Sequence, residues 1–315
     1  MTTGAYVVVV LVGAIVIDAA FGDPPNRWHP VAWLGVVIEA ARRRLAHGSP
    51  IRLLATGALV TFGVAAIAAA SAALVLRATL PLGAAAGVVE ALVLSTCLSV
   101  RGLRRAAAEI ARALENGDLA SARRAVSCHL VSRPTADLDP GEVAAATVES
   151  VAENLTDSVV APALMYLAFG LPGAAVYRAV NTADAMIGYR DGALEHFGKL
   201  AARADDVLNL IPARISALAI VAAAAFTGAS PRGALKTLWR DRRRTASPNA
   251  GWTMAAMAGA LNVRLTKRDA YTLGDGPLPS PRHIYASVLV MLTAASLSIG
   301  IPSMLLLLNT FQNTP

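Results

Sequence analysis

The sequence predicts an all-α, polytopic integral membrane protein with about four to six transmembrane or re-entrant helices and helical loops on the cytoplasmic side. Of the 315 residues, 55% are hydrophobic and only 16% are charged, and the mean hydropathy is +0.53. These values lie outside the range of ordinary soluble domains. The apolar residues are mostly Ala, Val and Leu, which suit close helix packing in lipid. They lack the alternating polarity of a transmembrane β-barrel.

The predicted spans follow from windows without charged residues. Such windows cover 1–17, 53–76, 158–177, 215–231 and 284–315, and a further window over 78–100 contains only Glu90. A helix needs about 20 apolar residues to cross the hydrocarbon core. The window 53–76, flanked by Arg52 and Arg77, is the clearest span, and 284–315 is nearly as clear. The first window lacks the basic start and small-residue cleavage site of a signal peptide, so we expect it to be retained.

The distribution of basic residues predicts the orientation of the chain. Arginines gather at 42–52, at 101–105 and at 240–244, and Lys and Arg accumulate on the cytoplasmic side of membrane proteins. We therefore expect one membrane-embedded domain over 1–315, with cytoplasmic segments near 21–52, 101–157, 178–214 and 232–283. Counting every window as a crossing would instead place the basic segment 178–214 outside. We favour the alternative in which 158–177 and 215–231 are buried or re-entrant.

Three carboxylates define a candidate acidic face in the segment EVAAATVESVAENLTD. Glu149, Glu153 and Asp157 are spaced i, i+4, i+8, which places them on one side of a helix, with Asn154 beside them. Like charges at this spacing repel one another. The pattern fits a divalent-ion or amine-binding face, and it equally fits an acidic face in solvent.

A second polar segment runs from 177 to 215. Arg178, Asn181 and Asp184 lie at helical spacing, and a further polar group at helical spacing precedes Pro212. Polar residues in apolar surroundings tend to be paired or functional. That second group consists of Asp205, Asp206 and Asn209, oxygen ligands of the kind that Mg²⁺ uses when it bridges substrate phosphates. The alternative is that Asp206 pairs with Arg203 or caps the next turn.

Several other chemistries are not supported by the sequence. GALEHFGKL resembles a P-loop, but five residues separate its glycines and Leu200 replaces the Ser or Thr, so only Lys199 is kept as a phosphate contact. Cys97 and Cys128 suggest neither a disulfide framework nor a thiolate metal site. The five histidines are dispersed. The net charge of +7 fits basic loops at an anionic membrane face, and nucleic acid is not an expected partner.

Five blocks carry a resemblance to a known family. They are GDPPNRWHPVAWLG, ESVAENLTDSVVAPAL, YRAVNTADAMIGYRD, ARADDVLNLIPARISAL and SPNAGWTMAAMAGAL, in this order between about Asp18 and Leu265. Together they resemble the successive signature blocks of the CobD/CbiB family of cobalamin biosynthesis. Ala183 and Ala185 depart from the expected pattern, whereas Asn181, Asp184 and Met186 stay in register.

The resemblance implies an integral membrane adenosylcobinamide-phosphate synthase. Such an enzyme joins a propionate side chain of adenosylcobyric acid to the amine of an amino-alcohol phosphate, such as aminopropanol phosphate, with ATP and Mg²⁺. A carboxylate is a poor acyl donor, so we expect ATP to form an acyl phosphate that the amine attacks. The site then needs cationic clamps for several anions and a base for the ammonium proton.

The residues and the resemblance together define the expected site. The loop after the first window would form part of its wall at the cytoplasmic membrane face, where Pro24 and Pro25 end the helix. Alternatively, this loop is only a rigid turn with Trp28 and Trp33 as interfacial anchors. The expected catalytic residues are Glu153, Asp157, Asp184 and Lys199; the metal ligands are Asp205, Asp206 and Glu149; the substrate-binding residues are Asp23, Arg27, His29, Asn154, Arg178, Asn181, Arg203, Asn209 and Arg214.

Two other functions fit part of the sequence. A transporter for an anionic solute would use helices broken near Gly188 and Pro212, although no inverted repeat is apparent. A non-catalytic scaffold would gather other cobalamin-pathway enzymes at the cell membrane. The preferred amino alcohol and the ATP site do not follow from the residues, and a homo-oligomer is compatible with them.

Overall fold

The computed structural model describes residues 3–131 and 134–312. The described chain is almost entirely α-helical, so the predicted all-α fold class is confirmed. It forms two compact units. Unit 1 comprises Met1–Ser99, Ala161–Asn209 and Pro302–Pro315, and unit 2 comprises Val100–Val160 and Leu210–Ile301.

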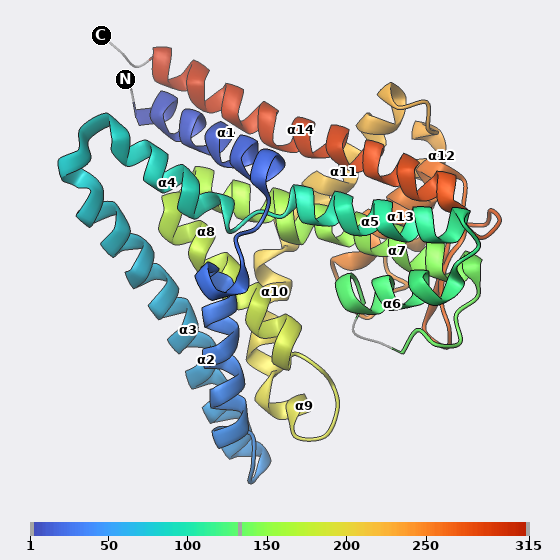
Figure 1. The fold of residues 1–315 in the computed structure, drawn as a ribbon, viewed down its shortest axis with the longest axis horizontal. Helices are drawn as coiled ribbons and strands as arrows, with labels where there is room; N and C mark the ends of the chain where they lie inside the picture. Colours follow the sequence, from blue (N-terminus) through green and yellow to red (C-terminus); the bar gives the residue numbers. More distant parts are fainter. Residues whose placement is uncertain (1–2, 132–133, 313–315) are drawn as a thin grey trace. The chain divides into compact units, whose positions relative to one another are not determined.

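Unit 1 is built around a long helix that packs against several shorter ones. This long helix, α3, forms an antiparallel pair with α2, to which it is joined by a short loop (Figure 1). The elements of unit 1 are α1 (Thr3–Phe21), η1 (Asn26–Trp28), α2 (Pro30–Leu45), α3 (Pro50–Thr79), η2 (Leu80–Ala85), α4 (Ala86–Ser95), α8 (Ala161–Ile187), α9 (Leu194–Phe197) and α10 (Lys199–Leu208).

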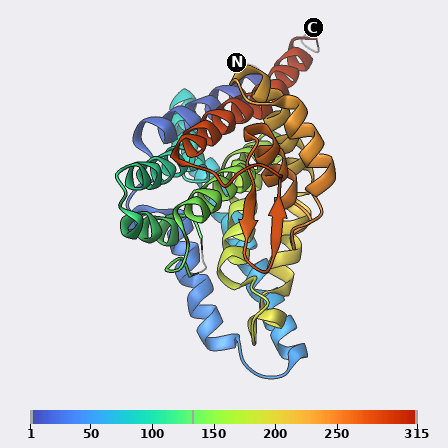
Figure 2. The same cartoon turned by 90° about the vertical axis from the view of Figure 1, so that its right-hand side faces the viewer.

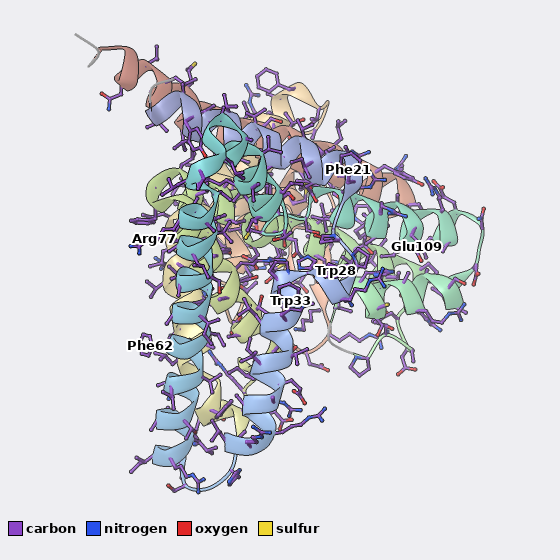
Figure 3. The ribbon with its side chains drawn as sticks, turned by 60° about the vertical axis from the view of Figure 1, so that its left-hand side comes forward. Phe21, Trp28, Trp33, Phe62, Arg77 and Glu109 are labelled. Carbon is purple, nitrogen blue, oxygen red and sulfur yellow. The ribbon has the colours of Figure 1, made fainter. Side chains whose placement is uncertain are left out.

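Helix α3 has one face that packs inward and one that faces outward. It begins at Pro50, with the Ser49 hydroxyl accepting from the backbone N–H of Arg52. Its 30 residues correspond to about 45 Å. Phe62 is 68% exposed and projects from the outer side of the helix (Figure 3). An apolar side chain on the outer face of so long an apolar helix suits contact with lipid.

Two glycines allow close packing around the junction of α9 and α10, Gly57 on the side of α3 and Gly198 on the side of α8. A Cβ added to Gly57 would lie 1.7 Å from the carbonyl oxygen of Phe197, and one added to Gly198 would lie 1.7 Å from the carbonyl oxygen of Ile187. Only residues without a side chain fit at such contacts. The backbone around Phe197, which joins α9 to α10, therefore lies directly against the first turns of α3, where Arg52 is also found.

A buried carboxylate links three helices of unit 1. Glu90 on α4 is 5% exposed. Its Oε2 accepts from the hydroxyl of Tyr6 on α1 at 2.7 Å, and its Oε1 accepts from the hydroxyl of Tyr166 on α8 at 2.9 Å. A carboxylate in an apolar segment needs such donors. The single charge in the window 78–100 is thus paired inside the helix bundle.

Unit 2 also consists mainly of helices. They are α5 (Val100–Glu115), α6 (Leu119–His129), α7 (Pro140–Leu155), α11 (Leu210–Phe226), α12 (Pro231–Asp241), α13 (Ala250–Leu261) and the greater part of α14 (Pro281–Gln312), with a π-helical turn, η3, at Thr156–Val160. Helices α12 and α13 approach closely where the backbones of Gly233 and Gly259 meet. Small residues at a helix contact permit this approach.

A small hairpin in unit 2 was not predicted. Strands β1 (Leu265–Lys267) and β2 (Tyr271–Leu273) pair antiparallel, with Leu265 opposite Leu273 (Figure 2). The fully buried Asp241 at the end of α12 accepts from the backbone N–H of Gly274 at 2.9 Å and pairs with Arg240. Burial acts to raise the pKa of Asp241, but the hydrogen bonds from Arg240 and Gly274 outweigh it and lower the pKa.

Four described helical stretches are long and apolar enough to cross a membrane. They are Gly4–Phe21, Pro50–Glu115, Pro140–Ile187 and Pro281–Asn309, and the pair α10 and α11, bent by 49°, would make a fifth. Helix α8 is itself interrupted at Gly170, which has a positive φ of 67°, and contains Pro172. The chain therefore has the multi-pass character that its composition predicts, with one break inside the window 158–177 and a bend just before the window 215–231.

Candidate functional site

A polar network in unit 1 joins α8 to α10. The side-chain amide of Asn181 donates to Oδ1 of Asp205 at 3.1 Å, and that of Asn209 donates to Oδ2 of Asp205 at 3.0 Å. The hydroxyl of Tyr177 donates to Oδ1 of Asn209 at 2.9 Å. Two blocks that are separate in the sequence therefore meet at one carboxylate.

The network lies in apolar surroundings and orients Asp205. Tyr177 is fully buried and Asn209 is 2% exposed. Buried polar groups of this kind are stable only when they are hydrogen-bonded. The spacing alone allowed Asn209 to share a face with either aspartate, and the structure shows that Asn209 binds Asp205. Adjacent Asp206 is half-buried and points elsewhere, since neighbouring helical residues diverge by about 100°.

The basic residues near this network differ in their surroundings. The guanidinium of Arg178 donates from Nη1 to Oδ1 of Asn181 at 3.3 Å. Lys199 and Arg203 lie one turn apart on the exposed side of α10. The alternative that Arg203 pairs with Asp206 stays open, since the two lie at i, i+3 on α10. Both cations are exposed to solvent, where an anion can reach them.

Asp184 folds back over the end of α8. Its backbone oxygen accepts from the N–H of Gly188 at 2.7 Å. A Cβ on Gly188 would lie 1.9 Å from Oδ1 of Asp184. The side chain of Asp184 therefore occupies the space that glycine leaves at position 188, and the Gly188 break identified in the sequence serves to place this carboxylate.

The loop between α1 and α2 holds two predicted residues together. Nδ1 of His29 accepts from the backbone N–H of Val31 at 3.2 Å and so caps α2. This bond leaves Nε2 as the donor to Oδ1 of Asp23, at 3.3 Å. Oδ2 of Asp23 accepts from the hydroxyl of Ser99 at 3.2 Å. The loop is thus a fixed turn, as its two prolines suggested.

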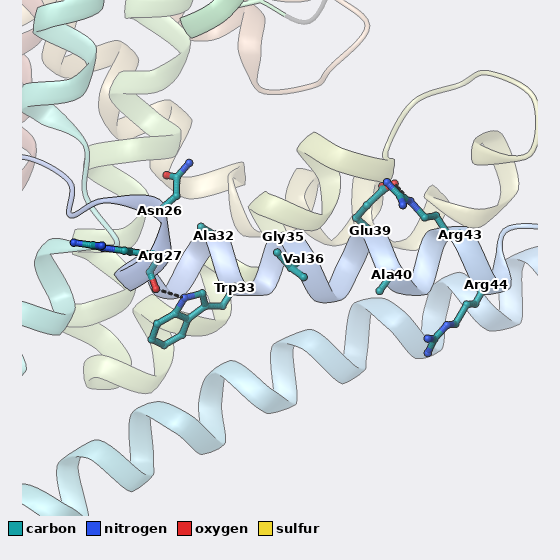
Figure 4. A pocket seen from close by; sticks show the side chains of 10 residues that line it. All are labelled: Asn26, Arg27, Ala32, Trp33, Gly35, Val36, Glu39, Ala40, Arg43 and Arg44. Atoms are coloured by element: carbon teal, nitrogen blue, oxygen red, sulfur yellow. Dashed lines mark hydrogen bonds and ion pairs between the residues drawn. The ribbon is translucent and has the colours of Figure 1, made fainter.

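A groove of about 900 Å³ runs along the outer face of α2 (Figure 4). Arg27 and Trp33 line one end, where the indole N–H donates to the carbonyl oxygen of Arg27 at 3.0 Å. Arg43 and Arg44 line the other end, and Arg43 pairs with Glu39 at 2.7 Å. Of the predicted loop residues, Arg27 therefore faces this groove, whereas Asp23 and His29 are not part of its lining.

The acidic residues of unit 2 lie on α7 and the π-helical turn that follows it. Glu149 is 5% exposed, and Glu153 and Asp157 are half-buried. The alternative of an acidic face in solvent is therefore wrong for Glu149. Asp157 lies in the π-helical turn η3. Only Glu149 and Glu153 therefore share one face of a regular α-helix. A π-helical turn widens the helix and is often found at functional sites.

Asn154 bridges α7 and η3. Its amide donates to the carbonyl oxygen of Ser150 at 3.0 Å, and its Oδ1 accepts from the hydroxyl of Ser158 at 3.0 Å. Both polar ends of the side chain are therefore engaged by the helix itself. This arrangement holds the segment between Glu153 and Asp157 in place.

A second cluster in unit 2 surrounds Arg214 and was only partly foreseen. Nη1 of Arg214 donates to Oδ1 of Asn249, and its guanidinium lies 4.6 Å from the ring centroid of Trp252. Arg242 stacks on Trp239 at 4.2 Å and lies 5.4 Å from Trp252. The block SPNAGW contains Asn249 and Trp252, which was the available signal for their importance.

The described residues do not form a closed metal site by themselves. Among them, no group of three or more His, Cys, Asp or Glu side chains is placed to hold a metal ion. Mg²⁺ bound through substrate phosphates uses only one or two carboxylates and keeps several waters. Each Asp205 oxygen accepts one hydrogen bond from a side-chain amide, and a carboxylate oxygen has a further lone pair. This carboxylate therefore fits a shared Mg²⁺ site, although not an all-protein cage.

Comparison with known proteins places the chain among cobalamin biosynthesis proteins. The family described as CobD/Cbib protein matches residues 11–289. The cobalamin biosynthesis protein CobD of Dehalococcoides mccartyi is 44% identical over 286 residues, covering 88% of this chain and 90% of that protein. A probable CobD of Methanothermobacter thermautotrophicus is 42% identical, covering 84% and 86%, and CobD of Klebsiella pneumoniae is 38% identical, covering 80% of each. No solved structure matches the chain.

Proposed function

This chain belongs to the CobD/CbiB family, and we propose that it is a membrane-embedded, ATP-dependent acid-amine ligase of cobalamin biosynthesis. Its substrates would be adenosylcobyric acid and an amino-alcohol phosphate, such as aminopropanol phosphate. The product would be adenosylcobinamide phosphate. The family relationship supports the pathway, and the chemistry is argued from the residues.

The reaction requires activation of a carboxylate. A propionate oxygen attacks the γ-phosphorus of ATP, and ADP leaves with the electrons of the broken P–O bond. The substrate amine then attacks the acyl carbon, and inorganic phosphate leaves as the amide forms. A base must accept the proton that the ammonium group loses before attack. Fixed positive charges must hold the phosphates and the carboxylate near one another.

The observation that carries this proposal is the network centred on Asp205. Asn181 and Asn209 orient the Asp205 carboxylate between α8 and α10. Burying a carboxylate costs free energy that its hydrogen bonds must offset, so stability alone gives little reason to place it there. Lys199 and Arg203 lie on the exposed face of the same helix, beside Asp206 rather than Asp205, where they would contact the phosphates.

Asp205 is the proposed protein ligand of Mg²⁺, and Asp206 the proposed residue that orients substrate. Mg²⁺, when bound, would neutralise charge on the transferring phosphoryl group. Glu149 remains a further predicted ligand, and Glu153, Asp157 and Asp184 remain the predicted catalytic carboxylates. Arg27, Arg178 and Arg214 remain predicted contacts of anionic substrate groups.

The proposed location is the cell membrane, with the site on the cytoplasmic side, where ATP is available. A homo-oligomer or an assembly with other cobalamin-pathway enzymes is compatible with this location. A transporter or a scaffold would share the membrane location, and neither would make a covalent product.

The test uses the purified full-length chain in detergent. It is incubated with adenosylcobyric acid, aminopropanol phosphate and Mg·ATP, and the corrinoid is analysed by mass spectrometry. The proposal predicts a corrinoid heavier by one condensed amino-alcohol phosphate, together with one ADP for each amide formed. The omission of ATP or of the amine serves as the control. ATP-independent corrinoid binding without an amide product would overturn the proposal in favour of a transporter or scaffold.

A further inference from the structure

Four arginines of unit 2 divide into two pairs according to their partners. Arg240 and Arg244 both pair with the buried carboxylate of Asp241, at 2.7 Å and 3.2 Å. Arg214 and Arg242 instead make hydrogen bonds only to neutral acceptors, which are Asn249, Pro248 and the carbonyl oxygen of Trp239. In the described part of the chain, no carboxylate pairs with either of them. Their positive charges are therefore not cancelled within the protein.

These two guanidinium groups lie close to each other. Their Cζ atoms are 4.6 Å and 5.4 Å from the centroid of the same Trp252 ring, so they are at most about 10 Å apart, close to the Debye length at physiological ionic strength. Two like charges at this distance repel one another. A multiply charged anion between them would relieve this repulsion and gain charge-assisted hydrogen bonds.

The same cluster offers an aromatic surface. Trp239 is 54% exposed, and its ring meets that of Trp252 at a centroid distance of 6.1 Å in an edge-to-face arrangement. An exposed indole stacks well on a planar base, and such stacking contributes about 1–3 kcal/mol for nucleobases. Arginines without carboxylate partners beside an exposed tryptophan match a ligand that is both polyanionic and planar.

We propose that Arg214, Arg242, Trp239 and Trp252 form the nucleoside triphosphate site of this protein, with the phosphates on the two arginines and the base on Trp239. This inference rests on the proposed function, since an ATP-dependent ligase needs such a site and the sequence contains no nucleotide-binding motif. Asn249 positions Arg214: it is 6% exposed and its Oδ1 accepts directly from the guanidinium.

Two residues of the proposed site lie outside the candidate membrane spans. Trp239 and Arg242 lie at and after the end of α12, in a segment that no candidate membrane span covers. Arg214 is in the second turn of α11, five residues after Asn209 in the sequence. Trp239 and Arg242 therefore lie outside the apolar spans, where a highly charged nucleotide stays solvated during entry, whereas Arg214 belongs to the bent pair of α10 and α11.

The test is equilibrium dialysis of the detergent-solubilised full chain against radiolabelled ATP in EDTA, which separates nucleotide binding from the Mg²⁺ site. Arg214→Gln and Arg242→Gln should each raise the Kd for ATP about tenfold, because each removes one charge-assisted contact. Arg243→Gln is the matched control, because Arg243 is an exposed neighbour with no described partner. It should change the Kd less than twofold.

Competing ligands identify which part of the nucleotide is bound. Tripolyphosphate should displace ATP from the wild type, but only at higher concentration, and Trp239→Leu should reduce this difference. Adenosine that bound as tightly as ATP would overturn the inference, since the cluster would then recognise an adenosyl group. Short-chain phosphatidylglycerol that displaced ATP at a lower concentration than tripolyphosphate would also overturn it in favour of a lipid-headgroup site.

The two proposals fail in different ways. If both arginine variants bind ATP like the wild type while amide formation continues, this site is wrong and the ligase function stands. If the wild type binds ATP with the predicted variant pattern but makes no amide, the nucleotide site stands and the ligase function is wrong. Because Arg242 follows the last residue of α12, outside the helix that carries Arg214, its variant gives a result even if Arg214→Gln does not fold.

Discussion

Asn181 and Asp205 lie on different helices, α8 and α10, and the side-chain amide of Asn181 donates to Oδ1 of Asp205 at 3.1 Å. The side-chain amide of Asn209 donates to Oδ2, so both carboxylate oxygens of Asp205 accept a hydrogen bond. A carboxylate with both oxygens hydrogen-bonded has a fixed orientation and keeps a lone pair on each oxygen. The proposed Mg²⁺ ligand requires such a fixed orientation.

The first prediction concerns Mg²⁺. Asp205→Asn should raise the Mg²⁺ concentration that gives half-maximal amide formation about tenfold, equivalent to a loss of about 1.4 kcal/mol of ion binding. Asp206→Asn should lower turnover with a smaller change in the Mg²⁺ requirement. Both variants are compared with the wild type at saturating ATP after size-exclusion chromatography in detergent. Unchanged Mg²⁺ dependence in both would move the metal site to Glu149, Glu153 and Asp157.

The second prediction concerns the acidic residues of unit 2. Glu153→Gln and Asp157→Asn should each abolish amide formation while the protein remains folded and membrane-inserted, because each substitution keeps the shape and removes the charge. Glu109→Gln is the control on the same unit, since the Glu109 side chain is 63% exposed and pairs with His129 at 3.7 Å. Wild-type turnover in both test variants would exclude a catalytic role for these carboxylates.

Sequence patterns predicted the site to the extent that spacing along one helix determines it. The i, i+4 relationship of Asp205 and Asn209 on α10 is such a case, and their hydrogen bond confirms the shared face. The contact between Trp252 and Arg214 depends instead on how α13 packs against α11, which no local pattern contains. The sequence also did not predict the burial of Glu149, because the pattern of one helix does not show which neighbouring helix covers a given residue.

Elements of the fold were likewise predictable where a local sequence pattern determines them. Apolar windows predicted the long helices, since about 20 uncharged residues have few alternatives in a membrane protein. The hairpin of β1 and β2 was not predicted because each strand has only three residues. The turn that joins the strands contains Asp269 at a positive φ of 57°. The π-helical turn η3 carries no signal in residue types. Its presence changes the direction in which Asp157 points relative to Glu153.

The third prediction concerns packing in unit 1. Gly57→Ala should destabilise the protein by about 1–3 kcal/mol, since its Cβ would collide with the carbonyl oxygen of Phe197 and force the backbone to shift. Gly63→Ala on the same helix is the control, because nothing lies within 4 Å of its added Cβ. Thermal unfolding in detergent should give a lower Tm for Gly57→Ala alone. Equal Tm values for both variants would show that α9 does not contact α3 in this way.

The fourth prediction concerns orientation in the membrane. Arg43 lies near the end of α2 that leads into α3, and Lys199 begins α10, whose connection to α9 lies against the first turns of α3. Arg43→Cys and Lys199→Cys should therefore react with an impermeant thiol reagent only after the cells are opened. The background variant is Cys128→Ser, because Cys128 is exposed and Cys97 is buried. Labelling of Lys199→Cys in intact cells would show instead that 158–177 crosses the membrane completely.

The central claim is that ATP activates the substrate carboxylate, and an isotope-transfer measurement tests it most directly. Adenosylcobyric acid labelled with ¹⁸O in the reactive propionate is converted by the purified protein with aminopropanol phosphate and Mg·ATP, and the released phosphate is analysed by mass spectrometry. If the carboxylate attacks the γ-phosphorus, one ¹⁸O atom appears in inorganic phosphate for each amide formed. Amide formation with no ¹⁸O in phosphate would contradict the proposed activation step.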